Sequence, residues 1–480
     1  MTIHETRLDP EVEIQLPDGR VYSGPRNSTL EQFFKAMPDW HKTAIVGGIV
    51  NSELRELTYP VTMDAKVQPV DIVSADGARI YRRSVTFLLE AAFEDTFPNV
   101  KLTVDHSVSS GGFYCEVTEH DPLTTAELET LETRMRELVK QDLPFERQQV
   151  TLDYAMEYFQ KKEQTDKIRL LKYRTKPWLI LYKLGDHQDY HHGYMVPSTR
   201  YLRWFDLKRL GQGFVLRFPR RSRPDELPPL PESPALVRSF RQYGEWLDRM
   251  GIPDVGALDD AIRDNKIHEV ILISEALHEQ KIGEIASQII KKQGQVRVIL
   301  IAGPSSSGKT TFSKRLSIQL LAQGADPYPV ELDNFFVNRE DTPRDEFGEF
   351  DFESIDAVNT DLLNSCLGDL IAGKEVRLPR YNYPLGISEP GDTIRLNKNQ
   401  IIILEGIHGL NPRLLEGFPG EQTHKLYVSC LTQLNLDRYN RISTTDTRLI
   451  RRIVRDSRER GYTASQTIKQ IGRASCRERV

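Results

Sequence analysis

Cysteine is scarce in this chain and shows no paired spacing. Only four of the 480 residues are cysteines, and no two of them form a C-x-x-C pair: Cys115, Cys366, Cys430 and Cys476. Four isolated cysteines exclude a disulfide scaffold of the kind that stabilises small secreted domains. We therefore expect a protein of the reducing cytoplasm.

Long apolar runs and a large net charge are also missing. No uninterrupted apolar segment approaches the ~18 residues that span a membrane, and the opening MTIHETRLDPEVEIQLPDG has neither the basic nor the apolar region of a signal peptide. The formal net charge of −5 argues against binding nucleic acid by overall charge, although a local basic face is compatible with it. We expect no membrane association.

The composition is that of a globular protein with several domains. Charged residues make up 28% of the chain and hydrophobic residues 39%. At about 150 residues per domain, a chain of this length suggests roughly three domains.

Residues 1–75 are predicted to form short strands and one helix. VEIQLPDGRVY places a Pro-Asp-Gly turn between two alternating runs, as in a β-hairpin, and LEQFFKAM follows as a helix. Together with GGIVNSELRELTYPV and VQPVDIVSA, this stretch resembles the small β-grasp TGS domain at the front of threonyl-tRNA synthetases. The residues themselves indicate no chemistry there.

Residues 76–218 carry a second resemblance to the same synthetases. YRRSVTFLLEAAFEDTFPNVKLTVDHSVSSGGFYCEV resembles their second additional domain, an α+β domain. AELETLETRMRELVKQ is predicted as a helix whose apolar residues share one face: Leu128, Leu131, Met135 and Leu138.

The synthetase editing site is not retained in this region. In the family, a His-x-x-x-His pair and a Cys-x-x-x-His pair form that site; here the first pair matches Arg83 and Phe87, and the second matches His191 and Met195. Arginine and phenylalanine cannot replace imidazoles as metal ligands or bases.

HQDYHH places His187 and His191 four residues apart, a spacing that could bind a metal on a helix. Gly193 follows closely and no third ligand is evident. We therefore predict a surface histidine cluster rather than a metal site.

Residues 219–294 connect the two halves. Residues 219–234 contain five prolines between Pro224 and Pro234, which predict a stiff linker, with partner binding by PPLP as the alternative. Residues 235–294 have helical periodicity and are predicted to form a small helical unit.

Residues 295–470 begin with the strongest motif in the chain. QVRVILIAGPSSSGKTTFSKRLSIQLL predicts a buried strand, a loop and a helix, the context of a Walker A phosphate-binding loop. Backbone N–H groups of such a loop hold nucleotide phosphates, Lys309 reaches the β and γ oxygens, and Thr310 holds Mg²⁺. The predicted ATP-binding residues are Gly303, Pro304, Ser305, Ser306, Ser307, Gly308, Lys309, Thr310 and Thr311.

The residues that follow favour a small-molecule kinase. YPVELDNFF is predicted to be a strand that ends at Asp333, where a carboxylate can accept the proton of an acceptor hydroxyl, with a turn-forming aspartate as the alternative. The motif Asp333 to Phe336 resembles the D-x-F-[FY] motif of the uridine kinase and phosphoribulokinase family.

That resemblance implies an acceptor site. Asp351 in EFDFESIDA matches a residue that binds sugar hydroxyls, Tyr381 in LPRYNYPLG matches an aromatic that packs on the nucleobase, and Phe336 is assigned to the same pocket. Gly386 stands where a pyrimidine-reading histidine is expected, which puts uridine in doubt as the substrate.

Two further motifs complete the predicted catalytic site. NQIIILEGIHGL is a buried strand ending at Glu405, which the family uses on Mg²⁺; a structural acid is the alternative. DTRLIRRIVRDSRERG resembles the family's arginine-bearing lid, with a solvated basic helix as the alternative. The lid arginines are Arg448, Arg451, Arg452 and Arg455.

The last ten residues do not continue this pattern. IGRASCRERV, residues 471–480, matches the translation of a common sequencing adapter, and we interpret it as an artefact. The kinase domain is then truncated, because the family adds a helix and a strand beyond this point.

The sequence thus predicts a multidomain α+β and α/β protein that ends in a P-loop NTPase domain with a parallel sheet. Its expected function is Mg²⁺-dependent transfer of the γ-phosphoryl group of ATP to a small acceptor, a nucleoside or related sugar. The alternative is an RNA- or ribosome-associated P-loop ATPase or sensor that uses the synthetase-like half. By analogy with the family, a homo-oligomer is expected.

Overall fold

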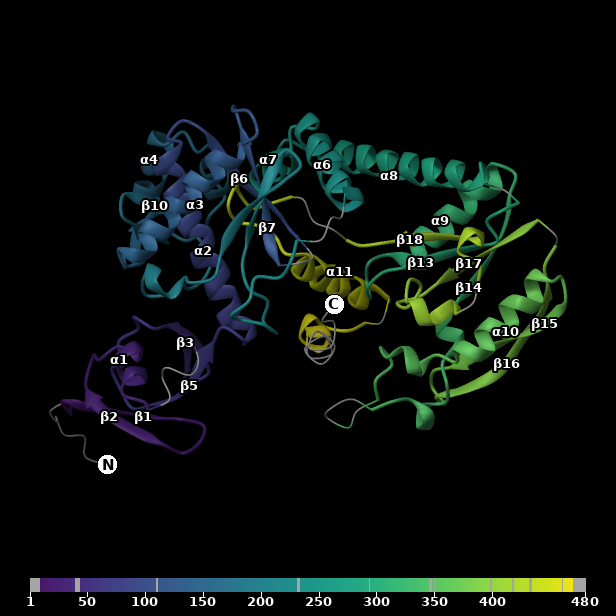
Figure 1. The fold of residues 1–480 in the computed structure, drawn as a ribbon, viewed down its shortest axis with the longest axis horizontal. Coiled ribbons are helices and arrows are strands. Elements are labelled where there is room, and N and C mark those ends of the chain that lie inside the picture. Colours follow the sequence, from purple (N-terminus) through teal and green to yellow (C-terminus); the bar gives the residue numbers. More distant parts are fainter. Residues whose placement is uncertain are drawn as a thin grey trace. The chain divides into compact units, whose positions relative to one another are not determined.

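The computed structural model describes residues 9–38, 44–108, 111–230, 234–292, 294–344, 348, 350–397, 399–416, 418–430, 434–459 and 461–468. The chain forms two compact units (Figure 1). One contains Met1–Asn265 with Gln433–Ile442, and the other contains Lys266–Thr432 with Ser443–Val480. The predicted domain boundaries are finer than this division and stay predictions.

The first unit begins with a mixed sheet of order β2-β1-β5-β3-β4. The predicted hairpin is β1 and β2, joined by a turn in which Gly19 has φ +86°. In β1, Val12 and Ile14 are buried and alternate with exposed residues, so one face of the sheet packs on α1. The elements are β1 (Glu11–Gln15), β2 (Val21–Pro25), α1 (Leu30–Lys35), β3 (Ile45–Val50), β4 (Glu53–Glu56) and β5 (Ala65–Asp71).

The rest of the first unit is built around the long helix α2 (Ala75–Thr96). Its buried residues share one hydrophobic core with α3 (Thr125–Lys140), whose four predicted core residues are all buried. Two antiparallel sheets, of order β11-β12-β7-β6 and β10-β9-β8, complete it. Their strands are β6 (Lys101–Ser107), β7 (Gly112–Thr118), β8 (Glu146–Thr151), β9 (Trp178–Leu184), β10 (His187–Asp189), β11 (Asp206–Leu210) and β12 (Gly213–Arg217).

The helical region falls into both units. Of the helices in predicted region 235–294, α6 (Pro234–Arg249) and α7 (Val255–Arg263) belong to the first unit and α8 (Ile267–Ile290) belongs to the second. The first unit also contains α4 (Leu152–Lys161), α5 (Thr165–Leu171) and η1 (Thr199–Tyr201). No helix in the described part of the chain is long and apolar enough to cross a membrane.

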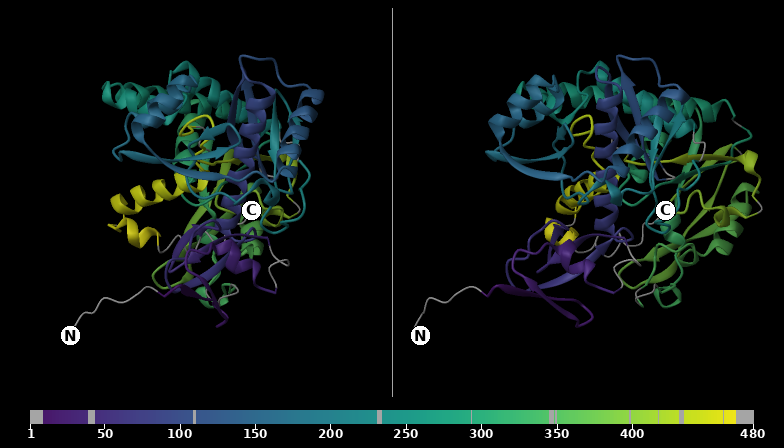
Figure 2. Two further views of the ribbon diagram at one scale, coloured as in Figure 1. Left: turned by 90° about the vertical axis from the view of Figure 1, so that its left-hand side faces the viewer. Right: turned by 60° about the vertical axis from the view of Figure 1, so that its left-hand side comes forward.

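The second unit contains a parallel sheet of order β14-β17-β13-β18. Apolar residues from α8 and α9 cover one face of the sheet, and α10 covers the other (Figure 1, Figure 2). All five residues of β13 are buried, as a strand covered on both faces requires. The parallel sheet predicted from sequence is therefore confirmed.

The elements of this unit are β13 (Val298–Ala302), α9 (Lys309–Ala322), β14 (Asp326–Glu331), η2 (Leu332–Phe335), η3 (Arg339–Asp341), η4 (Ile355–Ala357), α10 (Thr360–Ile371), β15 (Glu375–Asn382), β16 (Ile387–Arg395), β17 (Gln400–Glu405), η5 (Pro412–Leu415), η6 (Gly420–Gln422), β18 (Thr423–Tyr427) and α11 (Thr444–Glu459). Because the strands are parallel, β13, β14 and β17 end at the same edge of the sheet, where ligands bind in such folds.

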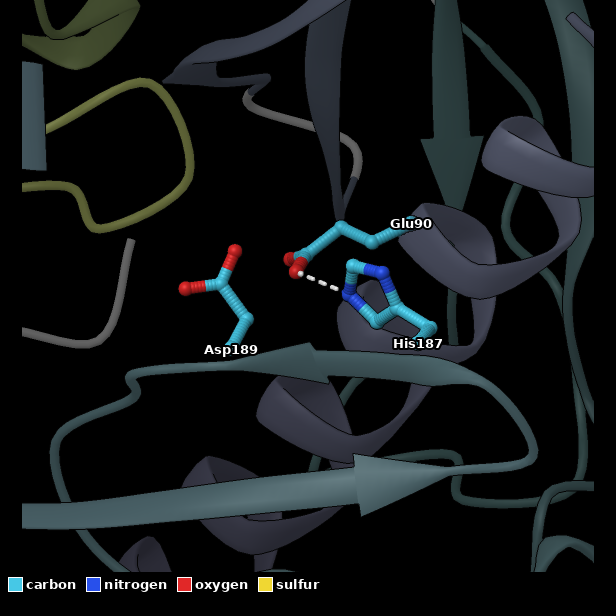
Figure 3. Close-up of side chains that lie close together, drawn as sticks. All are labelled: Glu90, His187 and Asp189. Atoms are coloured by element: carbon cyan, nitrogen blue, oxygen red, sulfur yellow. Dashed lines mark ion pairs between the residues drawn. The ribbon is translucent and has the colours of Figure 1, made fainter. Parts of the chain in front are cut away.

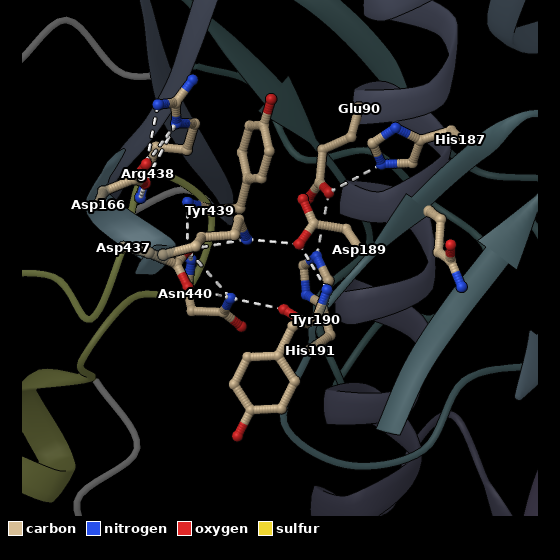
Figure 4. Close-up of polar contacts among 12 residues, drawn as sticks. Glu90, Asp166, His187, Asp189, Tyr190, His191, Asp437, Arg438, Tyr439 and Asn440 are labelled. Atoms are coloured by element: carbon tan, nitrogen blue, oxygen red, sulfur yellow. Dashed lines mark hydrogen bonds and ion pairs between the residues drawn. The ribbon is translucent and has the colours of Figure 1, made fainter. Parts of the chain in front are cut away.

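Residues Gln433–Ile442, between β18 and α11, belong to the first unit, although both flanking elements belong to the second. Arg438 pairs with Asp166, with an Nη2–Oδ1 distance of 2.8 Å, and Asn440 donates a 2.8 Å hydrogen bond to the backbone oxygen of Tyr190 (Figure 4). Residues 434–442 are thus held by the synthetase-like half, which the sequence did not predict.

Candidate functional site

The predicted phosphate-binding loop connects β13 to α9 as the motif requires. A Cβ at Gly303 would collide with the backbone oxygen of Val428, so only glycine fits there. Gly308 has φ +97° and caps the N-terminus of α9 in a left-handed conformation that favours glycine. The hydroxyls of Ser306 and Ser307 are buried without a hydrogen-bond partner, so they are available to a ligand in the loop.

The first turn of α9 meets the end of β17. The Thr310 hydroxyl donates a 2.7 Å hydrogen bond to Glu405 Oε1, while Glu405 Oε2 is buried without a hydrogen-bond partner. Burial raises the pKa of Glu405, against the opposing effect of the Thr310 hydrogen bond. A hydroxyl beside a carboxylate with one unused oxygen fits the oxygen ligands that Mg²⁺ prefers.

A cavity of 880 Å³ lies over these residues and is lined by both signs of charge. Its acidic residues are Glu331, Asp333 and Glu405, and Glu331 lies directly beside Glu405 in the register of β14 and β17. Its basic residues are Lys309, Lys314, Arg451, Arg455 and Arg458. The Lys309 ammonium donates a 3.2 Å hydrogen bond to the backbone oxygen of Pro304.

The predicted lid is helix α11, and two of its arginines contact the phosphate-binding loop. Arg448 Nε donates to the backbone oxygen of Ser305 at 3.2 Å, and Arg451 Nε donates to that of Ser306 at 3.3 Å. Guanidinium groups held on this loop could stabilise negative charge on a phosphate bound there.

The other two lid arginines share a buried partner. Arg455 donates two hydrogen bonds to Asp456 Oδ1, at 3.1 and 2.9 Å, and Arg452 Nε lies 3.7 Å from Asp456 Oδ2. Asp456 is fully buried, so it holds both guanidinium groups in place. Arg455 still lines the cavity.

The predicted strand ends two residues earlier than expected, so Asp333 lies in η2, just beyond β14, and lines the cavity. Its Oδ2 accepts a 3.3 Å hydrogen bond from the hydroxyl of Tyr383. Burial, together with the charge of Asp333, raises the pKa of that phenol above its usual range. Tyr383 therefore stays a hydrogen-bond donor at neutral pH, and the carboxylate of Asp333 stays oriented.

The three predicted acceptor residues do not belong to the described lining of this cavity. Phe336 and Tyr381 are buried, with ring centroids 5.6 Å apart, and form part of the core under the site. Asp351 accepts a 3.1 Å hydrogen bond from the backbone N–H of Glu353. Their assignment to the acceptor stays a prediction.

The turn at Gly386 has a local reason to exclude a histidine. Gly386 has φ +72°, and a Cβ there would lie 2.6 Å from Cζ of Arg339. Arg339 covers this turn and donates a 2.7 Å hydrogen bond to the backbone oxygen of Tyr383. A histidine at position 386 would require this arginine to move.

Several residues at the site were not singled out from the sequence. His408, three residues after Glu405, is partly buried, and its Nε2 has no hydrogen-bond partner. Burial lowers the pKa of His408, so the neutral imidazole is favoured. The position of His408 in LEGIHGL, directly after the proposed metal ligand Glu405, could have identified it from the sequence. For Lys314, Glu331 and Arg458, the sequence showed only that they are charged.

The histidines of the first unit differ from prediction. His187 and His191 are buried, and His187 is in β10 rather than on a helix, so the predicted surface cluster is wrong. Phe87 packs edge-on against both rings, with centroids 4.9 and 5.3 Å away. Arg83, which matches the first histidine of the synthetase editing pair, donates a 2.5 Å hydrogen bond to the backbone oxygen of Tyr194.

A potential third ligand, not evident from the sequence, lies near these histidines. Glu90 of α2 lies beside both rings, because packing of α2 on β10 brings together residues about 100 positions apart. Burial raises the pKa of Glu90, but the two imidazoles outweigh it and lower the pKa. Burial lowers the pKa of His187, but Glu90 and Glu94 raise it to about 9.

The parallel sheet, phosphate-binding loop and arginine-bearing helix define the second unit as a P-loop nucleotide-binding fold of the kinase type. Residues 298–477 match the model of the phosphoribulokinase / uridine kinase family, which confirms the resemblance predicted from sequence. The match extends into residues 471–477, the segment interpreted as an adapter artefact, which lies outside the described residues.

Curated relatives match the synthetase-like half. The chain is 28% identical over 261 residues to a threonine–tRNA ligase of Desulforamulus reducens, covering 51% of this chain and 41% of the ligase. It is 31% identical over 204 residues to that of Burkholderia mallei, covering 42% and 32%. The chain therefore spans about a third to two fifths of the length of these ligases.

Two solved structures show weaker likeness to part of the chain. "A possible uridine kinase" from Bacillus stearothermophilus has a TM-score of 0.27 and 24% identity, covering 32% of this chain and 81% of that one. D-glycerate 3-kinase from Cryptococcus neoformans has a TM-score of 0.20 and 18% identity, covering 27% and 52%.

Proposed function

We propose that the second unit transfers the γ-phosphoryl group of ATP to the hydroxyl of a small acceptor. The observation that carries this proposal is the convergence of three groups at one cavity: the phosphate-binding loop, the Thr310–Glu405 pair and Asp333. A nucleotide switch needs the first two, but it has no use for a carboxylate base beside an acceptor.

Each group has a role in phosphoryl transfer. Thr310 and Glu405 would hold Mg²⁺, which neutralises charge on the β and γ oxygens when bound. Lys309 and the lid residues Arg448, Arg451 and Arg455 stabilise the equatorial oxygens. Asp333 accepts the proton of the acceptor hydroxyl as its oxygen bonds to the γ-phosphorus; the bond from that phosphorus to the β–γ bridging oxygen breaks, and ADP leaves.

The acceptor is proposed to be a nucleoside or a related sugar, as in uridine kinase-like proteins. Asp351 is assigned to its hydroxyls, with Tyr381 and Phe336 on the side of its ring. Gly386 and the covering Arg339 argue against a histidine that reads a pyrimidine at this turn. A sugar hydroxyl, rather than a particular base, is therefore the group that the site recognises in this proposal.

We propose that the first unit has a regulatory or binding role rather than a catalytic one. Its TGS-like identity over residues 1–75, contact with RNA, a cytoplasmic location and a homo-oligomeric state are proposals that rest on likeness to threonine–tRNA ligases and on the family resemblance. They do not affect the chemistry of the cavity.

ATP turnover across a panel of nucleosides and sugars tests the proposal, with structured RNA as a separate arm. We expect Mg²⁺-dependent ADP release that rises with one class of acceptor and yields a phosphorylated product. ATP turnover that ignores every acceptor but rises with RNA would instead support the RNA-associated ATPase.

A further inference from the structure

A group of buried ionisable side chains lies between α2 and β10 of the first unit. Glu90 projects from α2, and His187 and Asp189, two residues apart, project from one face of β10 (Figure 3). Relative exposure is 6% for His187 and 1% or less for Glu90 and Asp189. One possible ligand atom from each residue lies within 4.8 Å of the others, and no other His, Cys, Asp or Glu triplet in the described part of the chain does this.

Each of the three residues has a buried polar atom without a hydrogen-bond partner. These atoms are Glu90 Oε1, Asp189 Oδ2 and His187 Nε2, the last of which forms no hydrogen bond but lies 3.4 Å from Glu90 Oε2. A single unsatisfied buried polar group costs about 1–3 kcal/mol, so three in one place call for a common explanation. One bound cation would satisfy all three.

The imidazole of His187 is oriented as a metal ligand would be. Its Nδ1 lies 2.7 Å from Oε2 of Glu94, one helical turn beyond Glu90 on α2. This hydrogen bond fixes the ring and directs Nε2 towards Glu90. Metal-binding histidines characteristically bond their second nitrogen to a carboxylate in this way.

The spacing of His187 and Glu90 suits a small dication. Ligands at ~2.0–2.1 Å from a tetrahedral ion lie roughly 3.3 Å apart. His187 Nε2 lies 3.4 Å from Glu90 Oε2, and the neighbouring His191 Nε2 lies 3.0 Å from the same oxygen. His191 therefore helps to hold the Glu90 carboxylate in place. Among the three ligands, nitrogen combined with carboxylate oxygen favours a zinc-class ion over Mg²⁺ or Ca²⁺.

The surrounding charge also balances with a dication. The Lys167 ammonium lies 2.5 Å from Asp189 Oδ1 and 3.5 Å from Asp437 Oδ1, which leaves Asp189 Oδ2 on the side of the cluster (Figure 4). Glu90, Asp189 and Asp437 together carry three negative charges, and a dication with Lys167 carries three positive charges. The further charge of Glu94 is paired with Lys162. Buried charges persist where they are compensated in this way.

We propose that Glu90, His187 and Asp189 form a binding site for a zinc-class divalent metal ion in the synthetase-like unit. Two of the positions that match the family's editing residues hold Arg83 and Phe87, and none of the three proposed ligands stands at a matched position. The site is also separate from the Mg²⁺ site proposed at Thr310 and Glu405.

Metal titration of the full-length protein tests the proposal. After treatment with a chelator and desalting, we expect the chain to bind about one equivalent of Zn²⁺ at micromolar concentration or below, and Co²⁺ to give visible d–d absorption bands typical of four-coordination. Zn²⁺ should also raise the midpoint of thermal unfolding.

Variants identify the ligands. Glu90→Gln and Asp189→Asn keep side-chain shape and should each abolish stoichiometric binding, with circular dichroism confirming the fold. Glu94→Ala removes the carboxylate that orients His187 and should weaken binding by about 10–100-fold. His120→Ala and Asp186→Asn, at exposed positions of the same unit, are matched controls and should bind as the wild type.

The rival arrangement is a metal-free cluster in which hydrogen bonds and ion pairs between the imidazoles and the carboxylates hold the residues together. It predicts no tight equivalent of Zn²⁺, no Co²⁺ spectrum and no thermal shift. That result, or undiminished binding by folded Glu90→Gln and Asp189→Asn, would overturn the proposal.

Discussion

The hydroxyl of Thr310 donates a 2.7 Å hydrogen bond to Glu405, joining the first turn of α9 to the end of β17. These residues are 95 positions apart in the sequence, and the parallel pairing of β13 with β17 brings them together. The bond orders a hydroxyl and a carboxylate beside the phosphate-binding loop without a ligand. The proposed metal site is therefore preorganised.

Glu405→Gln tests that role. The amide keeps the shape of the side chain but removes the charge that a metal ligand needs, so Mg²⁺-dependent ATP turnover should fall by about 100-fold or more. Turnover measured against Mg²⁺ concentration checks this, with the exposed Glu421→Gln as control. An unchanged Mg²⁺ dependence would remove Glu405 from the site.

Alanine substitutions at two glycines can distinguish the effect of backbone strain on stability from the loss of ATP binding. Gly308 has φ +97° and Gly324 has φ +87°, so alanine at either position costs about 1–2 kcal/mol of stability. Only Gly308 belongs to the phosphate-binding loop. Gly308→Ala should therefore also weaken ATP binding, by about tenfold, whereas Gly324→Ala should leave it intact.

Denaturant unfolding and ATP titration measure the two effects. Equal ATP affinities in both glycine variants would show that the geometry at Gly308 is not needed for nucleotide binding.

Arg451 of α11 contacts the loop through the backbone oxygen of Ser306. Arg451→Ala should lower kcat by about 100-fold or more with little effect on ATP binding, because guanidinium groups act mainly on transition-state charge. Arg395→Ala, an exposed arginine of the β15–β16 hairpin, is the control. A loss confined to KM would place Arg451 in ground-state binding instead.

The pair of Arg438 and Asp166 predicts a dependence of stability on pH. Burial raises the pKa of Asp166, but Arg438 outweighs it and holds the pKa below its usual value of 3.8. A lowered folded pKa contributes stability that is complete above the unfolded pKa and is lost as pH falls through the folded one. The first unit should therefore lose stability below about pH 4.

Arg438→Leu should remove this acid-sensitive term and leave Asp166 buried without its partner, at a cost of about 3 kcal/mol. Hydrogen exchange should report faster opening of residues 434–442. Wild-type exchange rates in that segment would contradict the anchoring function of the pair.

The sequence predicted features that depend on local pattern. The spacing of Leu128, Leu131 and Met135 specified the buried face of α3, and the Walker motif specified the strand, loop and helix around Lys309. Such signals need only the neighbours along the chain.

Features that depend on contacts between distant segments were missed. His187 was expected at the surface because nothing near it in the sequence shows that α2 covers it and supplies Glu90. Similarly, no local pattern around Arg438 indicates its pairing with Asp166, 272 residues away. Tyr383 follows the end of β15, so strand alternation could not show that it bonds Asp333.

The central claim is that Asp333 activates an acceptor hydroxyl in the cavity above the phosphate-binding loop. The most direct measurement compares phosphorylated product and ATP binding in the wild type, Asp333→Asn and the exposed control Asp341→Asn. We predict normal ATP binding in all three and a loss of product by two or more orders of magnitude in Asp333→Asn alone, about what a lost general base costs. Undiminished product from Asp333→Asn would contradict the account.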